Sequence, residues 1–243
     1  MGGETRVKRP KGVLLDYGGT LVDELGFDAR AGNAWLLAHA AYVAPGVTLD
    51  VVMTRAQRIS GEVSERRDEL GVEAPWPSLT RLIHDYFGTR FDLPMAELEL
   101  GFWDASMTTR AMPGARETLA AICAAGVPMA VVSNASFSAA TIRHEIAKHG
   151  LADNLAFVMV SSDYVVRKPN PLLFEAAATR LGVAPGEIWF VGDRLDTDVA
   201  GARAAGMVTV WLRPPNVTVS APADLTVDGW PELRREFDDA PTA

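Results

Sequence analysis

The chain has 243 residues, of which 31 are Asp or Glu and 23 are Lys or Arg, so its formal net charge is −8. Apolar residues make up 48% and charged residues 22%, which excludes wholesale disorder, and the acidic balance disfavours nucleic acid or an anionic membrane as a partner. The single cysteine, Cys123, excludes an intrachain disulfide framework and a cysteine-rich zinc site. No segment is long and apolar enough to cross a bilayer, so we expect a cytoplasmic protein.

Apolar runs with the length of buried strands recur along the chain. The first, 13–15, ends at Asp16, and others follow at 127–132, 155–160, 188–191 and 207–212. Helical patterns cover 115–125, 138–149, 171–181 and 198–205, and we expect an edge strand at 224–227 and a terminal helix at 230–237. This alternation of strand, turn and helix predicts an α/β fold, with a doubly wound parallel sheet and helices on both of its faces.

Residues 26–111 interrupt the alternation, because they contain few strand-like runs and much helical periodicity. Amphipathic patterns predict helices at 34–42, 49–65, 78–87 and 98–108, separated by Pro- and Gly-rich breaks. We therefore expect a helical bundle at 26–111, inserted into a core made of residues 1–25 and 112–243.

Polar residues end or closely follow several of the predicted strands. In open parallel sheets, ligands bind at the carboxyl ends of the strands, where these residues would gather. Each of them alone could form a turn or cap a helix. As a set in this chain order they predict one site, and they are Asp16, Thr20, Ser133, Asn134, Lys168, Asp193 and Asp198.

These motifs resemble those of the haloacid dehalogenase (HAD) superfamily. The resemblance rests on Asp16-Tyr17-Gly18-Gly19-Thr20, Ser133-Asn134, Arg167-Lys168-Pro169 and Gly192-Asp193 with Asp198 after it, and it covers almost the whole chain. It implies a Rossmann-like core, and it makes the insert at 26–111 the family's helical cap.

The resemblance also implies a chemistry and a role for each motif residue. A carboxylate held beside a divalent cation and a lysine can attack phosphorus and form an aspartyl-phosphate, which is the role implied for Asp16. Lys168 would supply positive charge, and Thr20 would brace the loop that carries the nucleophile. Ser133, Asn134 and Gly19 would bind the substrate. The implied cofactor is Mg²⁺, held at a site made by Asp16, the Gly18 carbonyl, Asp193 and Asp198.

One departure from the family pattern concerns Gly18. HAD phosphatases usually carry there a second aspartate, which protonates the leaving group and then activates water. Loss of a general acid costs on the order of 100- to 10,000-fold in rate. Asp23 or Glu24, just past the motif, could replace it, and so could His39 or His84 if either faces the nucleophile.

Gly18 leaves several functions open. We expect a Mg²⁺-dependent phosphatase of a small phosphorylated metabolite, acting as a monomer or homodimer. A phosphonate hydrolase would need a cap lysine, and the chain has lysines only at positions 8, 11, 148 and 168. A 2-haloacid dehalogenase would lack the metal and the Gly-Asp pair, and a non-catalytic member would bind a phosphorylated ligand or a protein without turnover.

Residues of the insert that could contact the substrate are Arg30, Asn33, Trp35, His39, Arg81, His84, Trp103 and Arg110.

Overall fold

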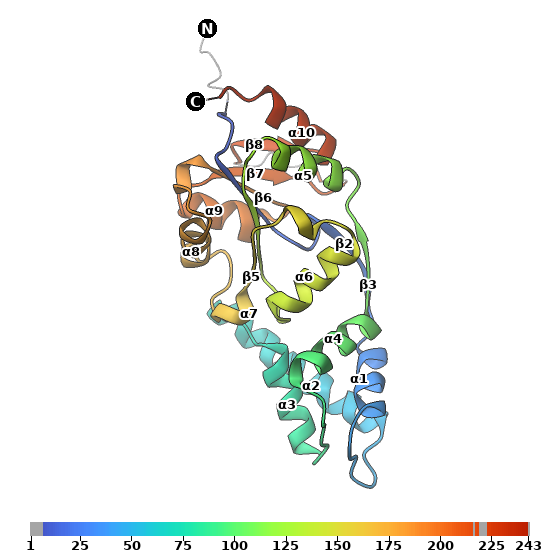
Figure 1. Ribbon diagram of the computed structural model, residues 1–243. Helices are drawn as coiled ribbons and strands as arrows, with labels where there is room; N and C mark the ends of the chain where they lie inside the picture. The colour runs from blue at the N-terminus through green and yellow to red at the C-terminus, as the bar shows by residue number, and fades with distance from the viewer. Residues whose placement is uncertain (1–6, 216, 219–222, 243) are drawn as a thin grey trace.

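A computed structural model describes residues 7–215, 217–218 and 223–242 of the chain, so the first six residues of the predicted core lie outside it. Its centre is a six-stranded sheet in the order β5-β4-β1-β6-β7-β8, in which every pairing is parallel (Figure 1). The strands are β1 (Gly12–Leu15), β4 (Met129–Ser133), β5 (Val158–Val160), β6 (Ile188–Gly192), β7 (Val208–Leu212) and β8 (Leu225–Val227). The predicted α/β fold with a parallel sheet is confirmed.

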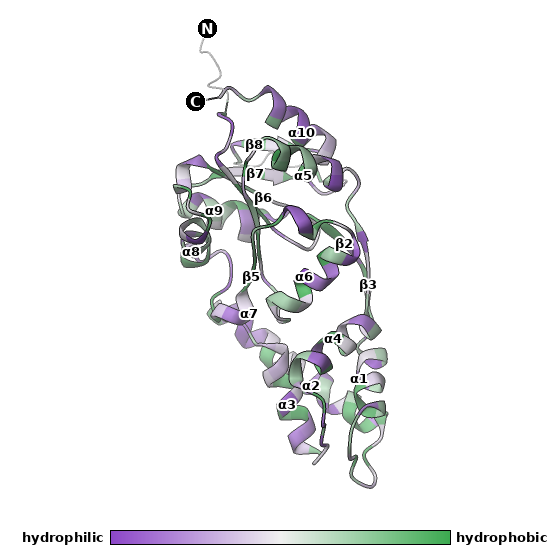
Figure 2. Cartoon of the chain, viewed as in Figure 1, coloured by the Kyte–Doolittle hydropathy of each residue, from purple (hydrophilic) through white to green (hydrophobic). Residues whose placement is uncertain are grey.

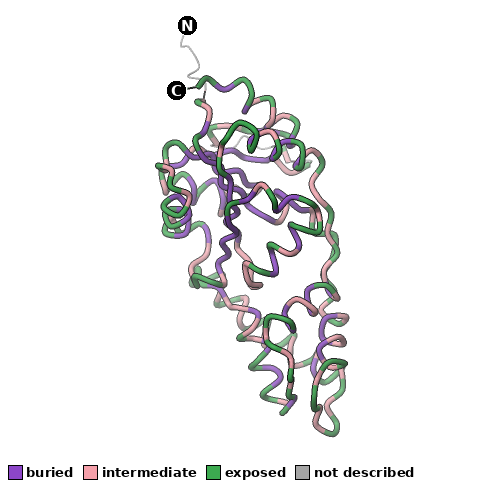
Figure 3. Tube along the Cα trace, viewed as in Figure 1, coloured by how far each residue is buried: buried purple, intermediate pink, exposed green. Residues whose placement is uncertain are grey.

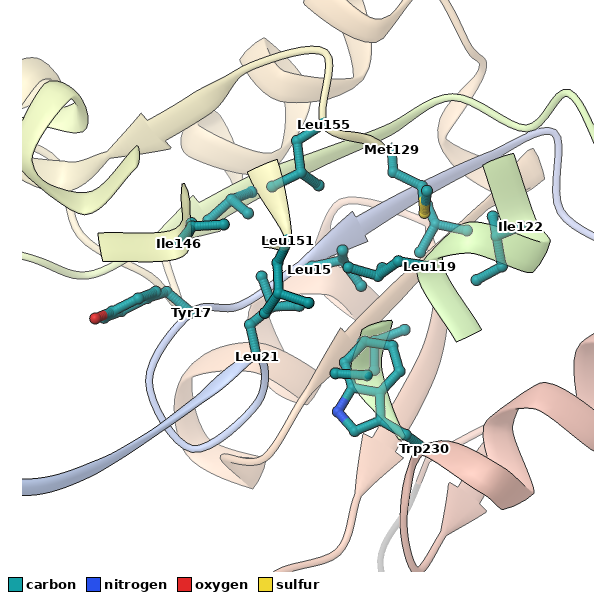
Figure 4. Close-up of a cluster of buried hydrophobic side chains, with 14 of the residues drawn as sticks. Leu15, Tyr17, Leu21, Leu119, Ile122, Met129, Ile146, Leu151, Leu155 and Trp230 are labelled. Atoms are coloured by element: carbon teal, nitrogen blue, oxygen red, sulfur yellow. The ribbon is translucent and has the colours of Figure 1, made fainter. Parts of the chain in front are cut away.

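Helices cover both faces of the sheet, because alternate residues of each strand point to opposite sides. Leu15 packs with α5 (Ala115–Ala124), α6 (Ala139–Lys148) and α10 (Trp230–Asp239) on one face, as Figure 4 shows. Leu14 packs with α8 (Pro171–Leu181) and α9 (Ala200–Ala204) on the other. The strands are consequently buried between two helical layers (Figure 3).

The position of β1 explains where a ligand site can form. From β1 the chain builds β4 and β5 on one side and then returns to place β6 on the other side. The connections leave β1 in opposite directions, so a crevice opens at its carboxyl end. Asp16 is the first residue after this strand.

A second group of elements lies beyond the end of the sheet. It contains α1 (Ala29–Ala38), α2 (Leu49–Leu70), α3 (Trp76–Tyr86) and α4 (Met95–Ser106), with a small hydrophobic cluster of its own. Two paired antiparallel strands, β2 (Val22–Phe27) and β3 (Met107–Ala111), connect this group to the core (Figure 1). These strands were not predicted, and the division of the chain into a core and a cap at 26–111 stays a prediction.

Several element ends differ from the predicted ones for local reasons. Helix α1 begins at Ala29, earlier than predicted, because the Asp28 carboxylate accepts hydrogen bonds from two free N–H groups of its first turn. Helix α2 is longer than predicted and ends at Gly71, whose φ of 64° is left-handed. A π-helical turn, Leu195–Val199, precedes α9 and contains Asp198 of the last motif. Among the described residues, no helix combines the length and apolar composition that a membrane crossing requires.

Helix α10 closes one face of the core, although its sequence is mostly hydrophilic (Figure 2). Its buried residues, Trp230, Leu233 and Phe237, lie on one side of the helix. The Trp230 ring packs in the core cluster, and its Nε1 donates a hydrogen bond of 2.8 Å to the carbonyl of Thr20. The terminal helix therefore supports the loop that follows Asp16.

Replacing Trp230 with Ala should remove both this packing and this hydrogen bond. We expect Trp230→Ala to lower the free energy of unfolding by about 3–5 kcal/mol in urea denaturation. Leu172→Ala is the control, because Leu172 is 59% exposed and its loss should change stability by less than about 0.5 kcal/mol. Equal effects of the two substitutions would contradict this account of α10.

Candidate active site

The carboxyl ends of the central strands bring most of the predicted site residues together in one cavity of about 890 Å³. Asp16 follows β1, Ser133 ends β4 and Asp193 follows β6. Predicted residues that line the cavity are Asp16, Gly18, Gly19, Ser133, Asn134, Lys168, Asp193 and Asp198. Thr20 is fully buried behind them.

Lys168 lies at the centre of the site and is 3% exposed. Its ammonium group donates hydrogen bonds of 2.6 Å to Asp16 Oδ1, 2.6 Å to Asp198 Oδ1 and 3.0 Å to the Val132 carbonyl. Burial alone would lower the pKa of Lys168, but the two carboxylates raise it above its usual range. The lysine therefore stays charged and fixes the Asp16 carboxylate in one orientation.

The side chain of Asn134 holds the Lys168 backbone in place. Its Oδ1 accepts a hydrogen bond of 2.8 Å from the Lys168 N–H, and its Nδ2 donates one of 3.0 Å to the Lys168 carbonyl. This bidentate contact couples the loop after β4 to the lysine. The resemblance gave Asn134 a different role, in substrate binding, which stays a prediction.

Asp16, Asp193 and Asp198 form the acidic cluster of the site, with one oxygen of each within 4.8 Å of the others. Burial, and then the charges of Asp16 and Asp198, raise the pKa of Asp193 to about 7. Burial also raises the pKa of Asp198, to about 6, although Lys168 opposes that rise. Carboxylates this close repel one another unless a proton or a cation lies between them.

These residues fit a hard divalent cation. Asp193 Oδ1 is buried and has no hydrogen-bond partner among the residues that the structure describes. An orphaned carboxylate oxygen in an acidic cluster is the kind of ligand that Mg²⁺ uses. Both oxygens of Asp198 already accept hydrogen bonds, from Lys168 and from the Arg194 N–H at 3.0 Å, so its observed contacts orient the lysine.

Two glycines make room for this cluster. Gly19 has a left-handed φ of 74°, and a Cβ there would lie 2.6 Å from Asp193 Oδ2. A Cβ on Gly192 would lie 2.4 Å from Asp198 Oδ2. The glycines of the first and last motifs are therefore required by the close approach of the two carboxylates. The Gly19 N–H is bonded to the Val22 carbonyl at 2.8 Å, and its predicted contact with substrate remains a prediction.

The space beside Gly18 is occupied by the carboxyl group of Glu24. A Cβ on Gly18 would lie 3.3 Å from the Glu24 carboxyl carbon, and both residues line the cavity. Partial desolvation of its carboxyl group, and then the charge of Asp16, raise the pKa of Glu24, although the residue as a whole is exposed. Asp23, its neighbour on β2, instead forms an ion pair of 2.6 Å with Arg110 on β3 and does not line the cavity.

The histidines considered as replacement acids lie elsewhere. His39 stacks on Trp35 with ring centroids 3.9 Å apart, and His84 packs edge-on against Phe91. Neither lines the cavity that contains Asp16. Of the insert residues considered for substrate contact, only Trp103 lines this cavity, and contact of the others with substrate stays a prediction.

Sequence analysis missed several charged residues around the cavity. Arg67 and Asp68 come from the end of α2, and Arg194 follows β6. Asp196, close to Arg194, was predicted only as a lesser site candidate or as the N-cap of the next helix. They are already paired, Arg67 with Asp68 at 2.9 Å and Arg194 with Asp196 at 2.7 Å. No motif marks the α2 residues, because only folding brings them to the site.

The comparisons with known proteins identify the class of this protein. A family model described as a haloacid dehalogenase-like hydrolase matches residues 10–206. The chain belongs to this family of hydrolases, as its motifs predicted.

Curated relatives and solved structures agree with this assignment. The glyceraldehyde 3-phosphate phosphatase of Methanopyrus kandleri is 57% identical over 56 residues, which are 23% of this chain and 24% of that relative. The chain thus matches only a quarter of that relative's length. The phosphoglycolate phosphatase of Yersinia pseudotuberculosis is 28% identical over 85% of this chain and 82% of its own length. The structure of a HAD phosphatase from Thermococcus onnurineus matches with a TM-score of 0.65 and 25% identity, over 96% of this chain and 99% of that one.

The raised pKa of Asp193 predicts how stability depends on pH in protein stripped of divalent ions. A native-state pKa of about 7, against an ordinary 3.8, means that ionising Asp193 destabilises the fold increasingly as the pH rises from about 4 to about 7. Asp193→Asn should therefore raise the Tm of the stripped protein at pH 8 by several degrees, and its advantage should shrink towards pH 4. Added Mg²⁺ should raise the Tm of the wild type but not that of Asp193→Asn.

Asp196→Asn is the matched control in a thermal-shift assay of these proteins. Asp196 lies in the same loop, but its hydrogen bonds with Arg194 lower its pKa, so removing its charge should not raise the Tm. A Tm of Asp193→Asn at or below that of the wild type at pH 8 would argue against the strained acidic cluster.

Proposed function

We propose that the protein is a Mg²⁺-dependent phosphatase of small phosphorylated metabolites that uses Asp16 as its nucleophile. The observation that carries this proposal is the Lys168 ammonium group, which bridges Asp16 and Asp198 at 2.6 Å beside the orphaned oxygen of Asp193. Curated relatives named as phosphatases of glyceraldehyde 3-phosphate, phosphoglycolate and hexitol phosphates support the substrate class.

In this proposal Asp16 attacks the phosphorus atom, and the bond from phosphorus to the ester oxygen breaks. Lys168 orients the attacking carboxylate and supplies positive charge near the transferring group. Water then cleaves the aspartyl-phosphate and releases inorganic phosphate. Ser133 and the Asn134 backbone, at the end of β4, would bind the phosphoryl oxygens that do not react.

Asp16, the Gly18 carbonyl and Asp193 would hold the metal ion, and Asp198 stays a predicted member of that site. When bound, Mg²⁺ would neutralise charge on the phosphoryl group and on the acidic cluster. A cluster that needs a cation favours a phosphatase over a dehalogenase that works without metal. The activity assay below therefore includes a haloacid as the alternative substrate.

Glu24 is the acid that we assign to the leaving group. Its carboxyl group fills the space beside Gly18 where the usual second aspartate would project, and its raised pKa favours a proton that it can give. The proton passes to the ester oxygen as the bond to phosphorus breaks. The Glu24 carboxylate then takes a proton from the attacking water.

Replacing the nucleophile should abolish turnover. We expect Asp16→Asn to have no phosphatase activity above background with a panel of phosphate esters, while its circular dichroism spectrum is unchanged. Excess chelator should abolish wild-type activity, and Mg²⁺ should restore it. Wild-type protein quenched in acid should carry an acid-stable, base-labile phosphoryl adduct that Asp16→Asn lacks. Turnover of a haloacid in chelator, without phosphatase activity, would support the dehalogenase alternative instead.

Removing the proposed acid should slow turnover without abolishing it. We expect Glu24→Gln to lower kcat about 100-fold or more on an alkyl phosphate. The effect should be smaller on an aryl phosphate, because a better leaving group needs less protonation. Asp23→Asn is the matched control on the same strand, and it should have little effect because it breaks only an exposed ion pair. An unchanged kcat in Glu24→Gln would remove Glu24 from the mechanism.

A further inference from the structure

A buried carboxylate from the predicted cap lies directly behind the proposed active site. Glu73 follows the end of α2 and its side chain is fully buried. It accepts hydrogen bonds of 3.0 Å from the Ser136 hydroxyl and 2.5 Å from the Ser161 hydroxyl, and it forms an ion pair with Arg167. Buried carboxylates need such donors, and every one of these side chains belongs to the core.

The contact with Ser161 extends to the loop after β4. The Ser161 hydroxyl donates to Glu73 and accepts a hydrogen bond of 3.0 Å from the Ala135 N–H. Ser136, which also donates to Glu73, is the next residue along the chain. Glu73 therefore fixes the loop that begins with Ser133 and Asn134 at two successive residues.

The contact with Arg167 extends to Lys168. The Arg167 N–H donates a hydrogen bond of 3.2 Å to the Gly71 carbonyl. The Glu73 N–H donates one of 2.5 Å to the Val165 carbonyl. Val165 has a left-handed φ of 65°, which is rare and strained for a β-branched residue. Backbone hydrogen bonds from the cap therefore flank the segment that leads into Lys168 and contains this unusual residue.

Glu73 does not line the cavity, whereas Ser136, Arg167 and Lys168 do. It therefore acts on the site through other residues. The two segments that it holds are the ones that Asn134 and Lys168 join by a bidentate contact.

We propose that Glu73 is a positioning residue, through which the docked cap sets the geometry of the Ser133–Asn134 loop and of Lys168. This inference rests on the proposed function, because these are the groups that orient phosphate and nucleophile in it. The site is then complete only while Glu73 is bound to the core. Small displacements of positioned groups lower the rate of the chemical step more than they weaken binding.

Among the described residues, the other hydrogen bonds between cap and core do not reach both segments. The Trp76 N–H, for example, donates a hydrogen bond of 2.8 Å to the Ser136 carbonyl and so reaches only the loop after β4. Glu99 of α4 accepts hydrogen bonds from the Ser138 N–H at 2.8 Å and the Ser138 hydroxyl at 2.6 Å, and so caps α6. Trp103 donates a hydrogen bond of 2.7 Å to Glu145, which lies in the second half of the same helix. These contacts attach the cap, whereas Glu73 also supports the segment before Lys168.

The test compares Glu73→Gln with Glu62→Gln, a matched control. Glu62 lies on α2 and its side chain is 65% exposed in an ion pair with Arg58. We expect Glu73→Gln to lower kcat between about tenfold and 100-fold on a phosphate ester, with KM changed much less. Glu73→Asp, which keeps the charge, should recover part of the rate. Glu62→Gln should match the wild type.

Hydrogen exchange supplies a readout that does not depend on activity. We expect faster exchange in Glu73→Gln than in Glu62→Gln for peptides covering 134–138 and 164–168. If wild-type protein hydrolyses no phosphate ester, the proposed function fails, and this comparison still tests the coupling. Unchanged exchange, or a lowered Tm with unchanged kcat, would show that Glu73 only attaches the cap and would overturn the inference.

Ser161→Ala covers the case in which Glu73→Gln does not fold. It removes one hydroxyl that links Glu73 to the Ala135 N–H and leaves the buried carboxylate with Ser136 and Arg167. We expect faster exchange at 134–138 and a smaller loss of kcat than in Glu73→Gln. Wild-type exchange and kcat in Ser161→Ala would likewise overturn the inference.

Discussion

The structure depends on one ammonium group held between buried carboxylates. Burying Lys168 is unfavourable unless its charge is compensated, and Asp16 and Asp198 supply that compensation at 2.6 Å each. Asp16 follows β1 and Asp198 lies in the π-helical turn after β6, so the lysine joins the segments that follow two neighbouring strands. Asp193 Oδ1 has no hydrogen-bond partner among the described residues, so a bound cation would complement the site.

The limited space beside Gly18 accounts for the glycine in the first motif. A side chain at Gly18 would meet the Glu24 carboxyl group at 3.3 Å, so an aspartate at one position and a glutamate at the other compete for one volume. The longer side chain of Glu24 reaches that volume from β2, whose pairing with β3 fixes its direction. An acid near the leaving group can thus be supplied by either strand or loop, provided that only one of them fills the space.

Sequence reasoning recovered the parts of the fold that short-range patterns encode. The strands around β1 are continuous apolar runs, and polar residues at their ends marked Asp16, Lys168 and Asp193. It missed β2 and β3, because most residues of β2 are exposed and show no burial alternation. Sequence reasoning left Asp23 and Glu24 as alternatives. The structure distinguishes them, because Arg110 of β3 forms an ion pair with Asp23. Glu73 carried no signal, since its partners lie 63, 88 and 94 residues away.

The arrangement of the buried acids suggests why the predicted cap is attached where it is. A cap attached through exposed pairs alone would gain little, because exposed ion pairs contribute about 0–1 kcal/mol. Glu73 is instead buried with several donors, and these hydrogen bonds would be lost together if the cap undocked. The donors belong to the segments that hold Asn134 and Lys168, so the free energy that docks the cap is drawn from the same contacts that shape the site. In the proposal above, loss of the Glu73 contacts would weaken the docking of the predicted cap and disturb the site together, whereas the Glu99 and Trp103 contacts only attach the cap to α6.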